Sequence, residues 1–190
     1  VLLRGLAGIG KSHLAAVAAA RFDGPTVTLD LQSIPSPRAL AAALGQALGI
    51  DGARPETVAH ALRDLGDVLV VLDPLEHLTD AAEWLHGWHR TAPRARWLVV
   101  SRGAVPSLGA LDIEVGPLAP SAARELLRVR AEARGVATDD DPSGRDRLLA
   151  ALDGLPLAIE LAAGRLGVLT MDELADHLDP HLLRSTSAGR

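Results

Sequence analysis

An eight-residue segment near the amino end, Gly5 to Ser12 (GLAGIGKS), constrains the fold of this chain more than any other feature. It matches the pattern G-x-x-x-x-G-K-[ST], and it lies between a short apolar run, Val1 to Arg4, and an alanine-rich stretch from about Lys11 to Arg21. A strand, a glycine-rich loop and a helix in this order place backbone N–H groups and the positive end of the helix around a phosphate. The sequence therefore predicts a nucleotide-binding P-loop.

Each residue type in the loop has an expected role. Glycines let the backbone turn inward, the lysine neutralises β- and γ-phosphate oxygens, and Ser12 holds Mg²⁺. Lys11 is the single lysine among 19 basic residues, so a chance match of a glycine-rich turn to this pattern is a poor explanation. We expect nucleotide contacts from these residues: Gly5, Gly8, Ile9, Gly10, Lys11, Ser12 and His13.

Strand and helix patterns alternate through the first part of the chain and then give way to helices alone. After the first strand, we expect strands at Thr26–Leu31, Val68–Leu72, Arg96–Ser101 and Leu111–Val115. We expect helices at about Lys11–Arg21, Arg38–Leu48, Pro55–Leu65, Thr79–Arg90, Ser121–Arg134, Ser143–Leu152, Pro156–Leu166 and Met171–Leu178. The predicted organisation is an α/β nucleotide-binding domain (1–119), a helical subdomain (120–180) and a linker or tail (181–190).

Asp73 and Arg102 each follow a predicted strand, at the carboxyl edge where open α/β sheets bind ligands. We expect Asp73 to bind Mg²⁺ through water, although an Asp after a buried strand can also be a turn or cap residue. From its position Arg102 can reach a γ-phosphate, and the alternative is a solvated surface arginine.

The residues after Asp73 bear on catalysis. A fast NTPase places an acid or amide close by to activate water, and neither Pro74 nor Leu75 can do this. Glu76, three positions on, is the nearest candidate. We therefore expect Lys11, Asp73, Glu76 and Arg102 to form the catalytic set and hydrolysis to be slow.

Composition limits the partners and the compartment. A net charge of −5 and a pI near 5.8 argue against a domain that holds nucleic acid by neutralising phosphates. No apolar run approaches the length of a membrane-spanning helix, and the absence of cysteine fits the cytoplasm. Because the chain opens at Val1 within an apolar run, we expect it to be one domain of a larger protein.

One predicted helix carries residues that could belong to a site or to the core. Glu83, His86 and His89 are spaced by three and could present metal ligands, although no second helix offers a matching set. Trp84 and Trp88 lie four apart, as residues that pack on one helix face do. We expect the two tryptophans to pack in the core, with a partner surface as the alternative.

Three segments together resemble the NB-ARC/STAND branch of the AAA+ ATPases, and most closely the ATPase domains of bacterial transcriptional regulators of the LuxR and SARP types. They are the P-loop, the run from Val68 to Leu78 (VLVVLDPLEHL), and the segment from Gly154 to Ala163 (GLPLAIELAA). Val99 to Arg102 resembles the sensor strand of that family.

The resemblance implies a parallel sheet ordered 5-1-4-3-2 with a helical subdomain that closes over ATP. It implies that Lys11 binds phosphates, that Ser12 and Asp73 bind Mg²⁺, that Arg102 senses the γ-phosphate and that Pro156 packs near adenine. In that family Asn or Asp usually follows the strand aspartate, where this chain has Pro74.

The leading hypothesis is an ATP-binding, slowly hydrolysing signal-transduction switch that associates with other domains of its chain and with further copies of itself. An alternative is a nucleotide-dependent scaffold without turnover. A small-molecule kinase would need an arginine-bearing lid between strands, and the sequence contains none. A GTPase is excluded because its N-K-x-D guanine-binding motif needs a second lysine.

Overall fold

The computed structural model describes residues 1–50, 52, 54–76, 78 and 81–178. Its contacts divide the chain into two compact units. The sheet unit contains Val1–Gly5 and Lys11–Glu114, and the helical unit contains Leu6–Gly10 and the chain from Val115 onward. The predicted linker or tail, 181–190, lies outside the described residues.

The sheet unit is built on five parallel strands in the order β2-β3-β4-β1-β5, so the predicted order 5-1-4-3-2 is confirmed. The strands are β1 (Leu2–Arg4), β2 (Thr26–Asp30), β3 (Leu69–Asp73), β4 (Arg96–Ser101) and β5 (Asp112–Glu114). The apolar residues of β3 are all buried, because a strand inside a parallel sheet is covered on both faces. β3 and β4 are neighbours, and their carboxyl ends therefore meet at one edge of the sheet.

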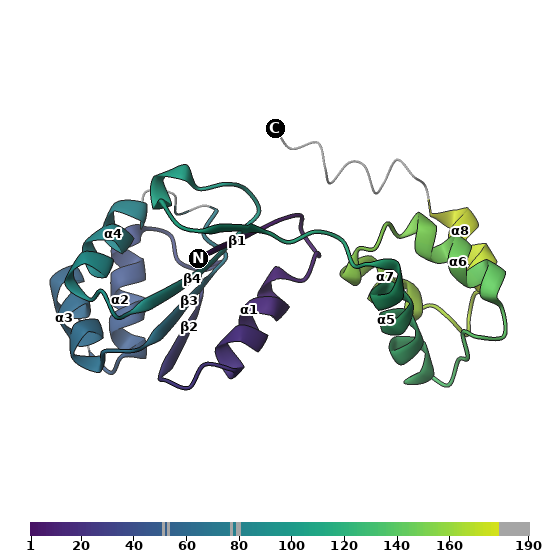
Figure 1. The fold of residues 1–190 in the computed structure, drawn as a ribbon, viewed down its shortest axis with the longest axis horizontal. Coiled ribbons are helices and arrows are strands. Elements are labelled where there is room, and N and C mark those ends of the chain that lie inside the picture. Colours follow the sequence, from purple (N-terminus) through teal and green to yellow (C-terminus); the bar gives the residue numbers. More distant parts are fainter. Residues whose placement is uncertain (51, 53, 77, 79–80, 179–190) are drawn as a thin grey trace. The chain divides into compact units, whose positions relative to one another are not determined.

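Helices cover both faces of the sheet (Figure 1). One face carries α1 and the other carries α2, α3 and α4, which gives three layers and confirms the predicted α/β fold. The helices are α1 (Lys11–Ala20), α2 (Pro37–Ala47), α3 (Pro55–Leu65) and α4 (Ala82–Thr91). Ser36 caps α2 by accepting a hydrogen bond from the Ala39 N–H at 3.2 Å, and a proline occupies the first position of both α2 and α3.

Element boundaries differ from the predictions in a few places. The helix expected from Thr79 begins at Ala82 in the structure, and Thr79 itself lies outside the described residues. The fifth strand is shorter than expected, and a short 3-10 helix, η2 (Pro106–Leu108), is not among the predicted elements. Three residues are too few to show a helical period, which is why the sequence carries no signal for η2.

The tryptophans pack in the core of the sheet unit, as expected. Trp88 is 2% exposed and stacks on Trp97 of β4, with ring centroids 5.8 Å apart and planes at 13°. Trp84 meets Trp88 edge-on at 6.1 Å, and the Trp88 indole N–H donates to the Pro55 carbonyl at 2.9 Å. These contacts tie α4 to both β4 and α3.

The helical unit contains α5 (Pro120–Glu132), α6 (Pro142–Ala151), α7 (Pro156–Ala163) and α8 (Met171–His177). α5 packs on α7 and α6 packs on α8. A separate apolar core joins the four helices, with fully buried side chains from Leu127, Leu148, Leu152 and Ile159. Because this unit has a core of its own, it meets the main physical requirement for an independent domain.

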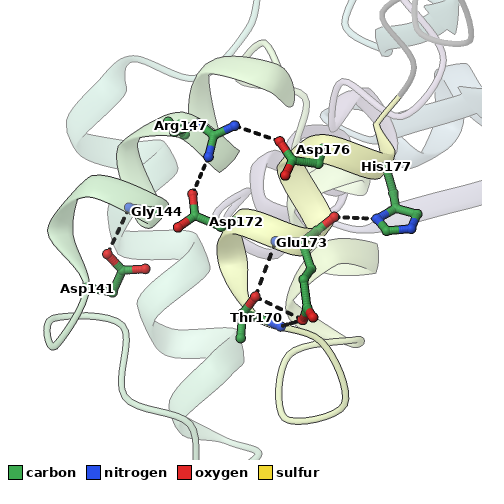
Figure 2. Close-up of polar contacts among 8 residues, drawn as sticks. All are labelled: Asp141, Gly144, Arg147, Thr170, Asp172, Glu173, Asp176 and His177. Atoms are coloured by element: carbon green, nitrogen blue, oxygen red, sulfur yellow. Dashed lines mark hydrogen bonds and ion pairs between the residues drawn. The ribbon is translucent and has the colours of Figure 1, made fainter.

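Polar contacts reinforce the packing of α6 and α8 (Figure 2). Arg147 of α6 donates to Asp172 and, at 2.7 Å, to Asp176 of α8. α8 begins with a capping box, in which the Thr170 hydroxyl accepts from the Glu173 N–H and the Glu173 carboxylate accepts from the Thr170 N–H. Among the described residues, no helix has both the length and the apolar character needed to cross a bilayer.

Candidate functional site

Lys11 is the first residue of α1, and its side chain is 8% exposed. Its ammonium group donates to the Gly5 carbonyl oxygen at 2.8 Å, which holds the side chain back along the loop. Burial lowers the pKa of Lys11 below its ordinary value, while Glu76 opposes that shift, Arg102 adds to it and Asp73 opposes it. The structure therefore groups these four charged residues, which the sequence predicted as the catalytic set.

The loop between Gly5 and Lys11 depends on glycine for its backbone. Gly8 and Gly10 have φ values of 75° and 96°, a region that side chains with a Cβ rarely adopt. Ile9 is 4% exposed, and its N–H donates to the Leu6 carbonyl oxygen at 3.3 Å, so this residue helps to fix the shape of the loop. This conformation leaves the amide groups of the loop as the chemical feature that can bind an anion.

Within the helical unit, the loop packs on the start of α7. The Leu157 N–H donates to the Gly8 carbonyl at 3.2 Å, and a Cβ built on Gly8 would lie 2.9 Å from the Leu157 Cβ. A Cβ on Gly10 would lie 3.9 Å from Cγ of Pro156, the first residue of α7. Pro156 thus lies against the loop, and Leu157 is a contact residue that the sequence analysis did not identify.

Asp73 is the last residue of β3, next to Asp30 in the register of β2. Within the described residues, neither the Asp73 carboxylate nor the Ser12 hydroxyl makes a hydrogen bond to the protein, so both oxygens are available as ligands. A carboxylate and a hydroxyl form the hard oxygen donor set that Mg²⁺ prefers, so these residues fit the ion. Asp30 Oδ1 accepts from the Gln32 N–H at 2.9 Å, so its carboxylate stabilises the turn after β2.

Glu76 and Arg102 come from the turns after β3 and β4, and the structure pairs them. Arg102 Nε lies 3.0 Å from Glu76 Oε1. The Leu75 N–H donates to the Val100 carbonyl at 2.8 Å, and fully buried Leu75 anchors the turn that carries Glu76. Two residues named separately from the sequence are therefore one ion pair, which their positions in the chain did not reveal.

The two oxygens of Glu76 differ in their surroundings. Oε1 faces Arg102, whereas Oε2 is buried and has no hydrogen-bond partner among the residues that the structure describes. A buried carboxylate oxygen without a donor is costly, and it is the kind of group that takes up a polar ligand such as water. Glu76 therefore fits the role of an acceptor for a water proton.

Ser12 and His13 follow Lys11 on α1, and both side chains are exposed. The Ser101 hydroxyl, which is buried, accepts from the Gly103 N–H at 3.3 Å and fixes the turn that presents Arg102. The Arg102 side chain itself is 71% exposed. An exposed guanidinium on a fixed turn is free to change partners.

His86 and His89 of α4, which the sequence offered as metal ligands, line a hollow away from the P-loop. His86 Nε2 lies 2.8 Å from the Leu108 carbonyl oxygen. Both His86 and His89 line a hollow of about 410 Å³ beside Trp97, at the amino ends of β1 and β4 and so away from the P-loop edge. In the described part of the chain, no group of three or more His, Cys, Asp or Glu side chains is placed to hold a metal ion.

Comparison with curated proteins identifies relatives in mycobacteria. An uncharacterised protein of Mycobacterium tuberculosis is 34% identical over 92% of this chain, which spans 47% of that protein. A second Mycobacterium tuberculosis protein, whose name proposes an HTH-type transcriptional regulator, is 32% identical over 94% of this chain and 21% of its own length. The chain thus spans about half or less of these relatives, and no known family profile matches it.

Solved structures share the fold. The Orc1 protein of Aeropyrum pernix, determined in complex with DNA, superposes with a TM-score of 0.65 at 20% identity, covering 97% of this chain and 60% of that one. A STAND signal-transduction ATPase with a tetratricopeptide repeat sensor from Pyrococcus horikoshii gives a TM-score of 0.59 at 17% identity, covering 93% and 29%. These proteins therefore share the fold of this chain, a five-stranded parallel sheet covered by helices on both faces.

Proposed function

We propose that this chain is the ATP-binding, slowly hydrolysing switch domain of a larger STAND/NB-ARC-type protein that regulates transcription. The observation that carries the proposal is the grouping of buried Lys11 with Asp73, Glu76 and Arg102 at the carboxyl edge of the sheet. The relative named for transcriptional regulation and the fold shared with a STAND ATPase support the same proposal.

The proposed binding step uses the loop and its lysine. Backbone N–H groups of Gly8, Gly10 and Lys11 bind the β-phosphate, and Lys11 exchanges its contact with the Gly5 carbonyl for phosphate oxygens. Ser12 and Asp73 would hold Mg²⁺, Asp73 through water, and the bound ion would neutralise charge on the β- and γ-phosphates. Pro156 at the start of α7 would pack near the adenine.

The proposed chemical step is hydrolysis of the γ-phosphate. Glu76 Oε2 accepts a proton from a water molecule as its oxygen bonds to the γ-phosphorus, and the bond from that phosphorus to the β–γ bridging oxygen breaks. ADP leaves with the bond's electron pair, phosphate is formed, and Arg102 stabilises the charge on the γ-oxygens. Turnover is slow, because Glu76 stands three residues after Asp73 and its other oxygen already faces Arg102.

The proposed switch links the two units through the loop. Leu6–Gly10 belongs to the helical unit, where it contacts α7, whereas Gly5 and Lys11 at its ends belong to the sheet unit. The segment from Pro117 to Pro120 is the proposed hinge of the switch. We further propose nucleotide-dependent self-association, and DNA contact by other parts of the full protein, since this chain has a net charge of −5.

A thermal-melting experiment tests nucleotide binding. The chain is melted with Mg²⁺ and ATP, ADP, GTP or no nucleotide, beside Lys11→Ala. A ligand at about 100 times its dissociation constant adds about 2.7 kcal/mol to the free energy of unfolding, which is a visible shift. The matched control is Arg90→Ala, which removes an exposed cation that forms no ion pair within the described residues. A shift with ATP or ADP that Lys11→Ala abolishes and Arg90→Ala retains supports the proposal, and no shift at millimolar nucleotide opposes it.

A nucleotide-dependent scaffold without turnover is the second candidate. Pro74 directly after Asp73 favours it, because the position next to the strand aspartate then carries no group that can activate water. Single-turnover phosphate release separates the two functions. Release above the rate of Lys11→Ala supports the slow ATPase, and release equal to that rate, with binding intact, supports the scaffold.

A further inference from the structure

Glu76 competes with any other anion for the positive charge of Arg102. Arg102 offers one guanidinium, whose Nε faces Glu76 Oε1 at 3.0 Å. Lys11 interacts electrostatically with both residues, so the pair lies within range of the group that binds phosphate in the proposed function. An anion that engages Arg102 from the side of Lys11 therefore competes with Glu76 for the guanidinium.

We propose that Glu76 lowers the preference of this site for nucleoside triphosphate over diphosphate, by competing with the γ-phosphate for Arg102. This inference rests on the proposed nucleotide site and deepens it. Glu76 weakens triphosphate binding more than diphosphate binding, because only the γ-phosphate takes Arg102 away from it. Glu76 is thus a specificity-determining residue as well as the proton acceptor.

The exposure of the two side chains indicates that this exchange is feasible. Arg102 is 71% exposed and Glu76 is 29% exposed, so water screens their attraction and little is lost when they separate. A γ-phosphate carries more negative charge than one carboxylate and accepts hydrogen bonds from a guanidinium in a forked geometry. The γ-phosphate therefore displaces Glu76 from Arg102, and this displacement lowers the affinity of the site for the triphosphate.

The exchange also changes the state of Glu76. Once Arg102 leaves, both oxygens of the carboxylate are without that cation, and Oε2 is already buried without a donor among the described residues. A carboxylate that has lost its cationic neighbour can accept hydrogen bonds from water through both of its oxygens. Engagement of the γ-phosphate by Arg102 thus prepares the residue that receives the water proton.

A double-mutant cycle tests the proposal by binding rather than by turnover. Dissociation constants for ADP and for a non-hydrolysable ATP analogue, both with Mg²⁺, are measured by calorimetry for the unchanged chain, Glu76→Gln, Arg102→Gln and the double variant. Glu76→Gln is expected to tighten binding of the ATP analogue about two- to fivefold more than it tightens binding of ADP, which is the range of an exposed ion pair. In the Arg102→Gln background this difference between the two nucleotides is expected to vanish.

The cycle separates competition from a general charge effect. Removing any carboxylate near Lys11 favours anions, but that effect persists when Arg102 is replaced. Equal tightening for both nucleotides, or the same tightening with and without Arg102, would overturn the proposal. Asp67→Asn is the matched control, because Asp67 pairs with Arg94 at 2.6 Å just before β3, away from the carboxyl edge, and it should alter neither affinity.

The binding measurements distinguish failure of the proposed function from failure of the competition alone. If neither nucleotide binds the unchanged chain, or if Lys11→Ala binds as well as the unchanged chain, the proposed function itself fails. If nucleotides bind but the cycle shows no coupling, only the competition fails. Glu76→Asp, which keeps the charge and shortens the side chain, provides a second variant and should shift the ATP preference in the same direction as Glu76→Gln.

Discussion

Gly8 and Leu157 approach so closely that no side chain fits between them. A Cβ on Gly8 would lie 2.9 Å from the Leu157 Cβ, and the Leu157 N–H donates to the Gly8 carbonyl at 3.2 Å. Both residues belong to the helical unit, so the middle of the P-loop is held by the first turn of α7. The glycine at this position serves packing as well as backbone conformation.

Gly8→Ala should therefore destabilise the protein and abolish nucleotide binding. Its φ of 75° disfavours a residue with a Cβ, and the overlap with Leu157 adds to that cost. We expect a loss of about 2–3 kcal/mol in the free energy of unfolding, measured by urea denaturation.

Gly49→Ala is the matched control for this change. Gly49 has the same φ of 75°, but a Cβ there would meet nothing within 4 Å. It should cost about 1–2 kcal/mol, the cost of the backbone conformation alone. Equal losses for the two variants would show that Leu157 moves aside and that packing does not require the glycine.

Gly87→Ala should stabilise the sheet unit. Gly87 lies in the middle of α4, and a Cβ there would meet nothing within 4 Å. Alanine restricts the unfolded chain more than glycine does, so the expected gain is about 0.5–1 kcal/mol in the free energy of unfolding. If chemical denaturation gives a lower free energy of unfolding for the variant, α4 has no space for a side chain at this position.

Arg147→Ala should weaken the helical unit by a small amount that depends on salt. Arg147 links α6 to Asp172 and Asp176 of α8, and all three side chains are at least half exposed (Figure 2). Exposed ion pairs contribute little and are screened by salt. The loss in denaturation midpoint, measured against Arg165→Ala, should therefore shrink at high salt. A loss that is independent of salt would point to packing by the arginine stem instead.

Nucleotide affinity should fall as the pH becomes alkaline. The fall should begin at a lower pH than it would for a lysine with its ordinary pKa. Burial lowers the pKa of Lys11, so the ammonium that binds phosphate loses its proton earlier as the pH rises. The same shift means that the unfolded chain binds this proton more tightly than the folded chain does. Protonated Lys11 therefore lowers the free energy of unfolding, and this cost decreases as the pH rises through the lowered pKa. Binding titrations across alkaline pH check the expectation. Lys11→Arg keeps its charge in this range, and an identical alkaline loss in that variant would contradict it.

Much of the fold follows from local patterns. The apolar run before Asp73 predicted β3, and prolines marked the starts of α3 and α7. The strand order came from a family resemblance rather than from these patterns, because neighbouring strands in a parallel sheet are joined by long crossovers that leave no local signal. η2 and the start of α4 show the opposite case, in which a short or irregular element has no period to detect.

By itself the sequence determined the chemistry available to this protein: a single lysine in a phosphate-binding pattern, an aspartate after the most apolar strand, and an arginine and a glutamate after neighbouring strands. Only the tertiary structure decided their partners. Arg102 faces Glu76, Leu157 closes on Gly8, and Asp30 lies beside Asp73, each across a separation in sequence that no periodic pattern spans. The physical reason is that residue type and spacing act along the chain, whereas competition between charges and close packing depend on which strand ends and helix ends the fold brings together.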